Sequence, residues 1–398
     1  MEIREQALGC FVIRGTVKAQ SPLHLGAEPR LGVVKGTKVY IPGSMLRGAV
    51  GLALARAVCV KPEYAKRHEE CPSREDCDYF QLFQDEGNRA SEVFFRNAYP
   101  RHEGCVGGGI YYPTPRTFFV CEDCGETRFN GFNPPKECPK CRGVLKPYEG
   151  YICSVCGHIA RAPVNLARIT RTAIDRRRYA AAMIRLPGEA EPFGTLHSRD
   201  VVAQGTCFGL EVVVGSKAEP CLKALTSTLE KALPDEGLGG GRSRGFGRVS
   251  VKISEVSRLD AGRFEDRASK LNSADFAIRL VSDALLEGLD LSGQTLVAAA
   301  RRAYTWIFKE GAPRLPSVKL IDRRVGEGRF SGWRLKEDRR REVLPTVAAG
   351  SVFRYRSDGV EVFSKALAAL EVLAVGGFKP MGLGQLRVKN MSGDSLEE

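Results

Sequence analysis

Long apolar runs are absent from this 398-residue sequence. No stretch reaches the roughly 20 consecutive apolar residues that a membrane-spanning helix requires. The first residues, Met-Glu-Ile-Arg-Glu-Gln, also lack the cationic start and apolar stretch of a secretory signal peptide. We therefore expect a cytoplasmic protein, in which the 13 cysteines serve a purpose other than disulfide bonding.

Acidic residues are scarce relative to basic ones. The chain has 60 lysines and arginines against 47 aspartates and glutamates, which gives a net charge of +13. A surplus of this size favours a polyanionic partner, and RNA, DNA and an anionic membrane surface all fit it. Hydrophobic residues make up 43% of the chain, which excludes a disordered chain and supports roughly two or three domains with buried cores.

Two glycine-rich loops carry embedded cations and lead directly into β-strand patterns. They are residues 237–247 (Gly-Leu-Gly-Gly-Gly-Arg-Ser-Arg-Gly-Phe-Gly) and residues 376–384 (Gly-Gly-Phe-Lys-Pro-Met-Gly-Leu-Gly). Glycine lets backbone amides approach a ligand closely, and successive amides in such a loop can bind an anion. We predict that these loops contact a phosphate backbone; the alternative is that glycine only permits tight helix–sheet packing. The predicted contact residues are Arg242, Ser243, Arg244, Arg248 and Lys379.

The secondary-structure patterns repeat in the two halves of the chain. Strand patterns cover residues 8–19 and 206–214 in the first half, and residues 276–282 and 351–356 in the second. A helical pattern precedes each glycine-rich loop, at residues 220–233 and 361–374. The order strand, helix, glycine-rich loop, strand therefore occurs twice, and it predicts an α+β fold with antiparallel sheets in two related halves.

A third candidate contact lies at the start of a predicted helix over residues 45–57. Ser44 is placed to cap this helix, and Arg47 falls in its first turn. Free amides and the helix dipole favour an anion at that end, so we predict a phosphate contact at Ser44 and Arg47. The alternative is that Arg47 only lies on the surface of the helix.

Four cysteines form two knuckles of metal-site spacing. Cys121 and Cys124 are followed, after thirteen residues, by Cys138 and Cys141. Paired C-x2-C turns at this spacing are typical of a tetrahedral zinc site, and the main alternative is an iron–sulfur cluster. A site of four thiolates leaves no open position for water or substrate, so we expect structural zinc.

A third knuckle, Cys153 and Cys156, needs partners if it binds a metal. The earlier segment with Cys59, His68, Cys71 and Cys77 can supply them, as can His102 or Cys105. We take Cys71 and Cys77 as the second pair of this possible site. The alternative is that the third knuckle shares or replaces ligands of the first site.

Residues 168–179 form an arginine-rich segment with a single acid. Guanidinium groups bind phosphate with two hydrogen bonds, and Tyr179 could stack on a base. We predict that this segment contacts RNA; the alternative is a solvated basic helix. The arginines that we assign to the contact are Arg171, Arg176, Arg177 and Arg178.

Three of these motifs resemble the CRISPR-associated RAMP superfamily, the repeat-associated mystery proteins. They are residues 41–48 (Ile-Pro-Gly-Ser-Met-Leu-Arg-Gly), residues 239–248 (Gly-Gly-Gly-Arg-Ser-Arg-Gly-Phe-Gly-Arg) and residues 173–178 (Ala-Ile-Asp-Arg-Arg-Arg). Within that superfamily, residues 94–100 (Phe-Phe-Arg-Asn-Ala-Tyr-Pro), the cysteine knuckles and the two-half layout look most like the large subunit of type III-D effector complexes. The resemblance covers nearly the whole chain.

The resemblance implies two tandem ferredoxin-like domains, over residues 1–257 and 258–398, with a zinc-binding insertion at about residues 59–165 of the first. It implies a subunit that holds or caps CRISPR RNA in a type III interference complex for antiviral defence, and that meets target RNA indirectly. Ser44 and Arg47 would then lie at the guide backbone, near the arginines of residues 242–248. The segment around Asp175 would form part of a thumb-like element between subunits.

Catalytic residues have weak support. Relatives that cut target RNA use an aspartate in the loop after the first strand, whereas residues 21–36 here contain no aspartate and one carboxylate, Glu28. His24 in that loop is a weak candidate base, but a histidine between two leucines is typical of a packed interior. Asp175, the other weak candidate, is flanked by arginines and is expected to form a salt bridge. We therefore expect a non-catalytic subunit; the alternatives are an endoribonuclease acting on precursor guide or target RNA, and a zinc-ribbon protein outside any CRISPR system.

Overall fold

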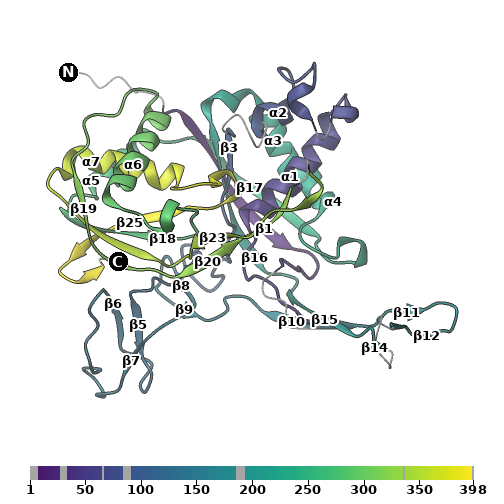
Figure 1. The fold of residues 1–398 in the computed structure, drawn as a ribbon, viewed down its shortest axis with the longest axis horizontal. Helices are drawn as coiled ribbons and strands as arrows, with labels where there is room; N and C mark the ends of the chain where they lie inside the picture. Colours follow the sequence, from purple (N-terminus) through teal and green to yellow (C-terminus); the bar gives the residue numbers. More distant parts are fainter. Residues whose placement is uncertain are drawn as a thin grey trace.

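The computed structural model describes residues 8–26, 34–64, 67–83, 91–184, 193–334 and 337–396. These residues form an N-terminal half around one sheet and a C-terminal half around a second sheet (Figure 1). Between two strands of the first sheet the chain leaves to form a cysteine-rich region and a long two-stranded arm (Figure 1). Across the described residues, no helix combines the length and the apolar character that crossing a membrane requires.

The N-terminal half contains a four-stranded sheet in which every neighbouring pair is antiparallel. Across the sheet, its strands are β17 (Val249–Arg258), β1 (Cys10–Ala19), β16 (Cys207–Gly215) and β3 (Val93–Phe95). Helix α1 (Gly43–Val58) follows β1, and a helical stretch that includes α3 (Leu222–Ser227) and α4 (Leu233–Glu236) follows β16. Apolar residues of these helices share one buried cluster with the strands, so the helices cover one face of the sheet.

The C-terminal half repeats this arrangement. Across its sheet, the strands are β19 (Val318–Arg324), β24 (Val352–Ser357), β18 (Asp275–Leu280), β25 (Leu386–Ser392) and β26 (Ser395–Leu396). Helix α6 (Gly293–Phe308) follows β18, and α7 (Val360–Leu373) follows β24. In both halves the first strand lies between the third and the fourth in chain order, with a helix after the first and the third. The predicted α+β fold, with its repeated order of elements, is confirmed.

The second face of each sheet is also packed. In the N-terminal sheet, Phe94 and Val213 join the buried cluster that contains α6, α7 and α5 (Ala261–Ser269). The Phe94 ring meets the Trp306 ring of α6 edge-on, with 5.5 Å between their centroids. The helices of the C-terminal half thus pack against the sheet of the N-terminal half, which buries this part of its outer face.

The cysteine-rich region, residues 101–160, consists of two small sheets. Their strands are β4 (Tyr111–Pro113), β8 (Tyr151–Cys153) and β9 (Ile159–Ala160) in one sheet, and β6 (Arg128–Asn130), β5 (Phe118–Cys121) and β7 (Leu145–Pro147) in the other. Phe132, 1% exposed, packs with residues on the outer face of the C-terminal sheet, including Ala277 and Met391. A backbone bridge between Gly131 and Ser395 extends this contact.

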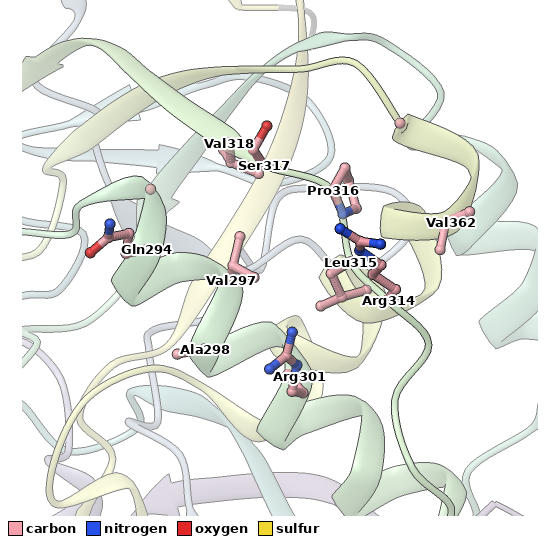
Figure 2. Close-up of a pocket in the computed structure, with 12 residues that line it drawn as sticks. Gln294, Val297, Ala298, Arg301, Arg314, Leu315, Pro316, Ser317, Val318 and Val362 are labelled. Atoms are coloured by element: carbon pink, nitrogen blue, oxygen red, sulfur yellow. The ribbon is translucent and has the colours of Figure 1, made fainter.

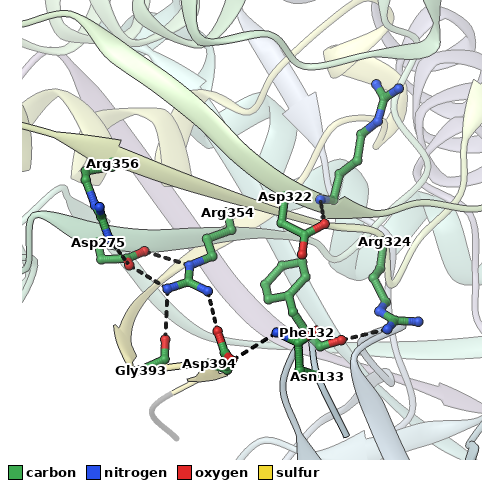
Figure 3. Close-up of polar contacts among 10 residues, drawn as sticks. Phe132, Asn133, Asp275, Asp322, Arg324, Arg354, Arg356, Gly393 and Asp394 are labelled. Atoms are coloured by element: carbon green, nitrogen blue, oxygen red, sulfur yellow. Dashed lines mark hydrogen bonds and ion pairs between the residues drawn. The ribbon is translucent and has the colours of Figure 1, made fainter.

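Polar contacts fix the same junction (Figure 3). Asn133 donates to the Asp394 carboxylate over 2.9 Å, and Arg324 donates to the Phe132 carbonyl over 2.6 Å. Arg354 lies between Asp394 and Asp275 and donates to both, at 2.7 to 3.0 Å (Figure 3). The cysteine-rich region of the first half is therefore attached to the sheet of the second half, and does not stand apart from both.

The arm projects away from both halves (Figure 1). It consists of the antiparallel strands β10 (Leu166–Arg171) and β15 (His197–Val202), and the short strand β2 (Val34–Lys35) pairs with β15 in parallel. The short strands β11 (Ile174–Asp175), β12 (Ala180–Ala181), β13 (Met183–Ile184) and β14 (Phe193–Gly194) extend the arm. The arginine-rich segment therefore lies on strands and a turn, which excludes the basic helix that was its alternative.

Candidate nucleic-acid interface and metal centres

The first glycine-rich loop presents one 3₁₀ turn, η5 (Arg242–Arg244), to solvent. Gly241 and Gly245 flank the turn with φ of +80° and +87°, a conformation that side chains disfavour. The Gly240 amide donates to the His24 carbonyl over 2.9 Å, and the Gly247 amide donates to the Pro22 carbonyl over 3.0 Å. These bonds clamp the loop against the segment after β1 and leave the turn outside.

The arginines of this loop differ in their partners. Arg242 forms an ion pair with Glu236 and also donates to the Glu236 carbonyl over 2.9 Å. Arg244 and Arg248 are exposed, and no acidic side chain of the described residues pairs with either of them. Ser243 is exposed between them. The loop therefore offers two unpaired guanidinium groups, whereas Arg242 mainly holds the loop to the end of α4.

The base of the arm meets this loop. The Arg171 guanidinium lies over the Phe246 ring, 4.7 Å from its centroid, and donates to the Arg244 carbonyl over 3.4 Å. Arg168, on the same strand, is instead neutralised by Asp200, to which it donates over 2.8 and 3.3 Å. Arg171 thus links the loop to the arm, and we call the following arginines of these two segments the basic surface. Its members are Arg171, Arg176, Arg177, Arg178, Arg244 and Arg248.

The tip of the arm is organised by Asp175. Its carboxylate accepts from the Arg177 amide over 2.9 Å and lies 3.8 Å from the Arg178 guanidinium. The expectation that Asp175 forms a salt bridge is confirmed. This turn leaves the side chains of residues 176–178 exposed, and Tyr179 is 92% exposed beside them.

The predicted phosphate contact at Arg47 needs correction. Arg47 is 9% exposed, and it donates to Ser91 Oγ over 3.0 Å and to the Phe83 carbonyl over 2.9 Å. Its guanidinium also lies 4.8 Å from the centroid of the Phe83 ring. A buried guanidinium with these partners is unavailable to a phosphate, so we remove Arg47 from the interface.

Ser44 is not the cap of its helix. Helix α1 begins at Gly43 after Pro42, and no side chain of Pro42 or Ser44 caps it. The Gly43 amide donates instead to Asn97 Oδ1 over 2.8 Å. Because the Asn97 side chain and the second glycine-rich loop cover this helix end, the predicted anion contact there is also corrected.

The second glycine-rich loop packs inside the molecule. Its turn, η7 (Lys379–Met381), precedes Gly382, where an added Cβ would lie 2.8 Å from Asn97 Oδ1 and 3.0 Å from Gly43 Cα. Lys379 is half-buried, and desolvation, with the nearby charges of Arg302 and Arg96, lowers the pKa of Lys379 to about 8. The loop therefore joins the two halves, and Lys379 is poorly placed for the RNA contact that the sequence predicts.

His24 has the environment of a packed side chain. It is 8% exposed, its Nδ1 lies 3.0 Å from the Asp200 carbonyl oxygen, and Gly239 and Gly240 pack against it. The interpretation of His24 as a packed interior histidine is confirmed. Glu28, the one carboxylate that the sequence offered in this loop, lies outside the described residues.

The first two knuckles bring four thiols together. The sulfurs of Cys121, Cys124, Cys138 and Cys141 all lie within 4.8 Å of one another. The Cys121–Cys141 and Cys124–Cys138 sulfur distances are 3.4 and 3.9 Å. Sulfurs at the corners of a zinc tetrahedron, about 2.3 Å from the ion, stand about 3.8 Å apart, so this group fits zinc. The predicted residues thus form a set that could hold a metal ion.

Hydrogen bonds from Thr127 favour the thiolate form of two of these thiols, Cys124 and Cys138, whereas the neighbouring thiols raise the pKa of Cys141. The Thr127 backbone amide is the main reason why the pKa of Cys124 falls to about 6, and the Thr127 hydroxyl, 3.0 Å from Cys138 Sγ, lowers the pKa of Cys138. A lowered pKa favours the thiolate, which is the form that binds zinc. None of the 13 cysteines, all of which are described, forms a disulfide.

Of the partners that the sequence offers for the third knuckle, the preferred pair Cys71 and Cys77 is wrong, and the structure brings His102 and Cys105 there instead. Cys153 and Cys156 lie with His102 and Cys105, and these four ligating atoms are within 4.8 Å of one another. Cys71 ends the turn η2 (His68–Glu70), and Cys77 precedes α2 (Asp78–Phe83), which packs on α1. The packing of α2 against the N-terminal half holds those two thiols away from the third knuckle. The spacing of His102 and Cys105, with two residues between them as in the three C-x2-C knuckles, is the sequence pattern that favours them as the partners.

A cavity of about 840 Å³ lies in the C-terminal half (Figure 2), and none of its lining residues belongs to the first glycine-rich loop. Helix α6, residues 314–318 and the start of α7 line it, with Val297 and Leu315 among its apolar residues. Its charged lining residues are Arg301 and Arg314, both exposed, and it brings no carboxylate or histidine together. The cavity thus offers positive charge but no acid–base pair.

A comparison with family profiles agrees with the motifs. The sequence profile of the RAMP superfamily matches residues 16–250, more than half of the chain. A chain of a structure described as type III-B Cmr-beta in the apo state is 15% identical, with a TM-score of 0.35, over 62% of this chain and 98% of that one. A chain of type III-B Cmr-beta bound to cognate target RNA is 13% identical, with a TM-score of 0.32, over 63% of this chain and 62% of that one. No curated protein matches the chain. From the profile match, which spans the N-terminal sheet, the cysteine-rich region and the first glycine-rich loop, we conclude that the chain belongs to the RAMP superfamily.

Proposed function

We propose that this protein is a non-catalytic, guide-RNA-binding subunit of a type III CRISPR effector complex, which holds or caps the guide. Membership of the RAMP superfamily and the basic surface support this proposal. The finer assignment to the large subunit of a type III-D complex rests on residues 94–100 and on the cysteine knuckles. Its partners would be CRISPR RNA and the other subunits, with target RNA met indirectly.

We further propose that each half is a ferredoxin-like domain, with a boundary near residue 257. Two observations support this: both halves follow the order strand, helix, strand, strand, helix, strand, and both place the first strand between the third and the fourth. In this scheme the cysteine-rich region is a zinc-binding insertion of the first domain. Its knuckles build a fold too small and too polar to be stable without a metal.

The observation that carries the RNA proposal is that the basic surface is largely exposed, whereas the outer faces of the sheets are partly covered. RNA-recognition folds commonly stack bases on an open sheet face. Here part of each outer face is covered: the first sheet packs on α6 and α7 at Phe94 and Val213, and the second packs on Phe132 at Ala277 and Met391. We therefore assign phosphate binding to the arginines of the basic surface, so binding is expected to depend strongly on salt.

The test is to mix the purified protein with a guide RNA that carries the repeat sequence of its own locus. We expect binding that weakens steeply as salt rises, and an intact RNA after prolonged incubation. Metal-independent cleavage that is lost in His24→Ala would contradict the proposal and support an endoribonuclease. Binding that does not change with salt would remove the phosphate contacts on which the proposal rests.

A further inference from the structure

The third knuckle of the cysteine-rich region shares its backbone geometry with the first two. In each, the fourth residue after the first cysteine has positive φ: Gly125 at +65°, Arg142 at +63° and Gly157 at +66°. The amide of that residue donates to the carbonyl of the first cysteine, over 3.0, 2.8 and 3.2 Å in the three knuckles. This turn points both thiols of a C-x2-C pair to one side. Cys153 and Cys156 are therefore arranged like the two knuckles of the four-thiol group.

A second turn faces this knuckle and supplies two more ligating atoms. The His102 amide donates to the Gly109 carbonyl over 2.8 Å, and the Cys105 amide donates to the His102 carbonyl over 3.0 Å. The turn brings Cys105 and the His102 ring toward the knuckle, with His102 Nδ1 3.3 Å from Cys156 Sγ. All four ligating atoms lie within 4.8 Å of one another. We infer that His102, Cys105, Cys153 and Cys156 bind a second zinc ion.

The packing around the group supports a built site. A Cβ on Gly109 would overlap the Cys153 sulfur and lie 3.3 Å from the Cys105 sulfur, so the two thiols occupy space that only glycine leaves open. Two rings hold the His102 imidazole, with centroids 4.8 Å away for Tyr111 and 5.0 Å away for His158. His158 Nδ1 lies 2.9 Å from the Tyr111 hydroxyl, which engages His158 outside the group. These contacts select His102 as the fourth ligand.

Three thiolates and one imidazole are a ligand set that zinc binds tetrahedrally, with no open position. The second ion would join residues 102–105 to residues 153–156, next to the point where the Arg101 amide donates to the Cys207 carbonyl of β16 over 2.9 Å. The four-thiol group lies in the other small sheet, which leads to Phe132 and the C-terminal half. The two ions would therefore fix opposite ends of the cysteine-rich region, one to each half of the protein.

The experiment is to measure the zinc content of the purified full-length protein and of single variants by mass spectrometry. We expect about two zinc ions per chain in the wild type, and about one in Cys156→Ser and in His102→Ala. His102→Cys should keep two zinc ions, because a thiolate replaces the imidazole as a ligand. If the ring had only a packing role, cysteine would not restore the second ion. Cys71→Ser and Cys77→Ser are the matched controls and should keep two.

Cobalt substitution provides a second measurement that does not depend on the stability of one variant. With two sites filled, the thiolate-to-cobalt absorption of the wild type should exceed that of Cys156→Ser, and His102→Cys should raise it above the wild type. One zinc ion in the wild type, or loss of zinc in Cys71→Ser or Cys77→Ser, would overturn the inference. An unchanged zinc content in both Cys156→Ser and His102→Ala would overturn it as well.

Discussion

In each half, a glycine-rich loop joins the last helix to the last long strand, and corresponding hydrogen bonds hold the two loops. The Leu238 amide donates to the Gly247 carbonyl over 2.8 Å, and the Val375 amide donates to the Gly384 carbonyl over 2.9 Å. Each loop contains one 3₁₀ turn that ends at a glycine with φ near +88°, Gly245 in the first loop and Gly382 in the second. The two loops thus have closely similar backbones.

Their surroundings differ. Nothing described lies within 4 Å of a Cβ built on Gly245, whereas one built on Gly382 would touch Asn97, Gly43 and Phe95. The turn of the first loop is exposed and carries Arg244, which pairs with no acidic side chain of the described residues. The turn of the second loop is half-buried against α1 and β3. The same backbone therefore serves as a ligand-binding candidate in one half and as a joint between halves in the other. Glycine content and cations alone do not distinguish the two roles.

The largest expected effect is on stability, at the two equivalent glycines. In Gly382→Ala the new methyl group meets backbone atoms in addition to adopting positive φ, and we expect a loss of about 3 kcal/mol in the free energy of unfolding. In Gly245→Ala the methyl group meets open space, so the cost should be about 1 kcal/mol, from φ alone. Urea unfolding of the two variants measures this difference, and equal costs would show that the second loop is not a packed joint.

The next effect concerns RNA affinity. Replacing Arg244 and Arg248 together by alanine removes two predicted phosphate contacts, so guide-RNA affinity should fall roughly tenfold or more and the salt slope should flatten by about 2. The matched control is the double change Arg301→Ala with Arg314→Ala, which removes the same charge from two exposed arginines of the cavity in the C-terminal half. A similar loss of affinity in the control would mean that net charge, and not the first loop, attracts the RNA.

The sequence predicts those features of the two loops and of the metal sites that depend on residues close together in the chain. The order strand, helix, loop, strand and the C-x2-C spacing are local patterns, and the structure contains both. What surrounds Arg47 and Lys379 depends on contacts between segments far apart in the chain. Arg47 meets Ser91, and the second loop meets Gly43, across separations that a periodic pattern does not encode. The same limit applies to the third knuckle: the sequence names His102 and Cys105 as well as Cys71 and Cys77, and the choice between them depends on contacts in space.

A smaller effect is expected at Arg242, where the structure departs from the sequence prediction. Its partner Glu236 has a side chain that is 7% exposed and that also pairs with Arg56. Arg242→Ala should therefore lower the free energy of unfolding by about 1 kcal/mol, since Arg56 remains, and should leave the salt slope of RNA binding unchanged. Arg244→Ala should leave the free energy of unfolding unchanged and should flatten the salt slope of RNA binding. If Arg242→Ala flattened the slope as much as Arg244→Ala does, Arg242 would be a phosphate contact after all.

The smallest effect is a dependence of stability on alkaline pH that arises in the second loop. Desolvation lowers the pKa of Lys379 to about 8 in the folded protein, against 10.5 for an unperturbed lysine. Between these two values the unfolded chain binds more protons at this position, so the free energy of unfolding should rise with pH across this window. Since Lys379 is half-buried, water screens part of the cost, and we expect a rise of about 0.5 kcal/mol. Lys379→Met has no charge to desolvate and should lack this contribution. The free energies of unfolding of the variant and the wild type should therefore approach each other from pH 8 to pH 10. Parallel curves would mean that the ammonium group of the second loop is as well solvated as the guanidinium groups of the first.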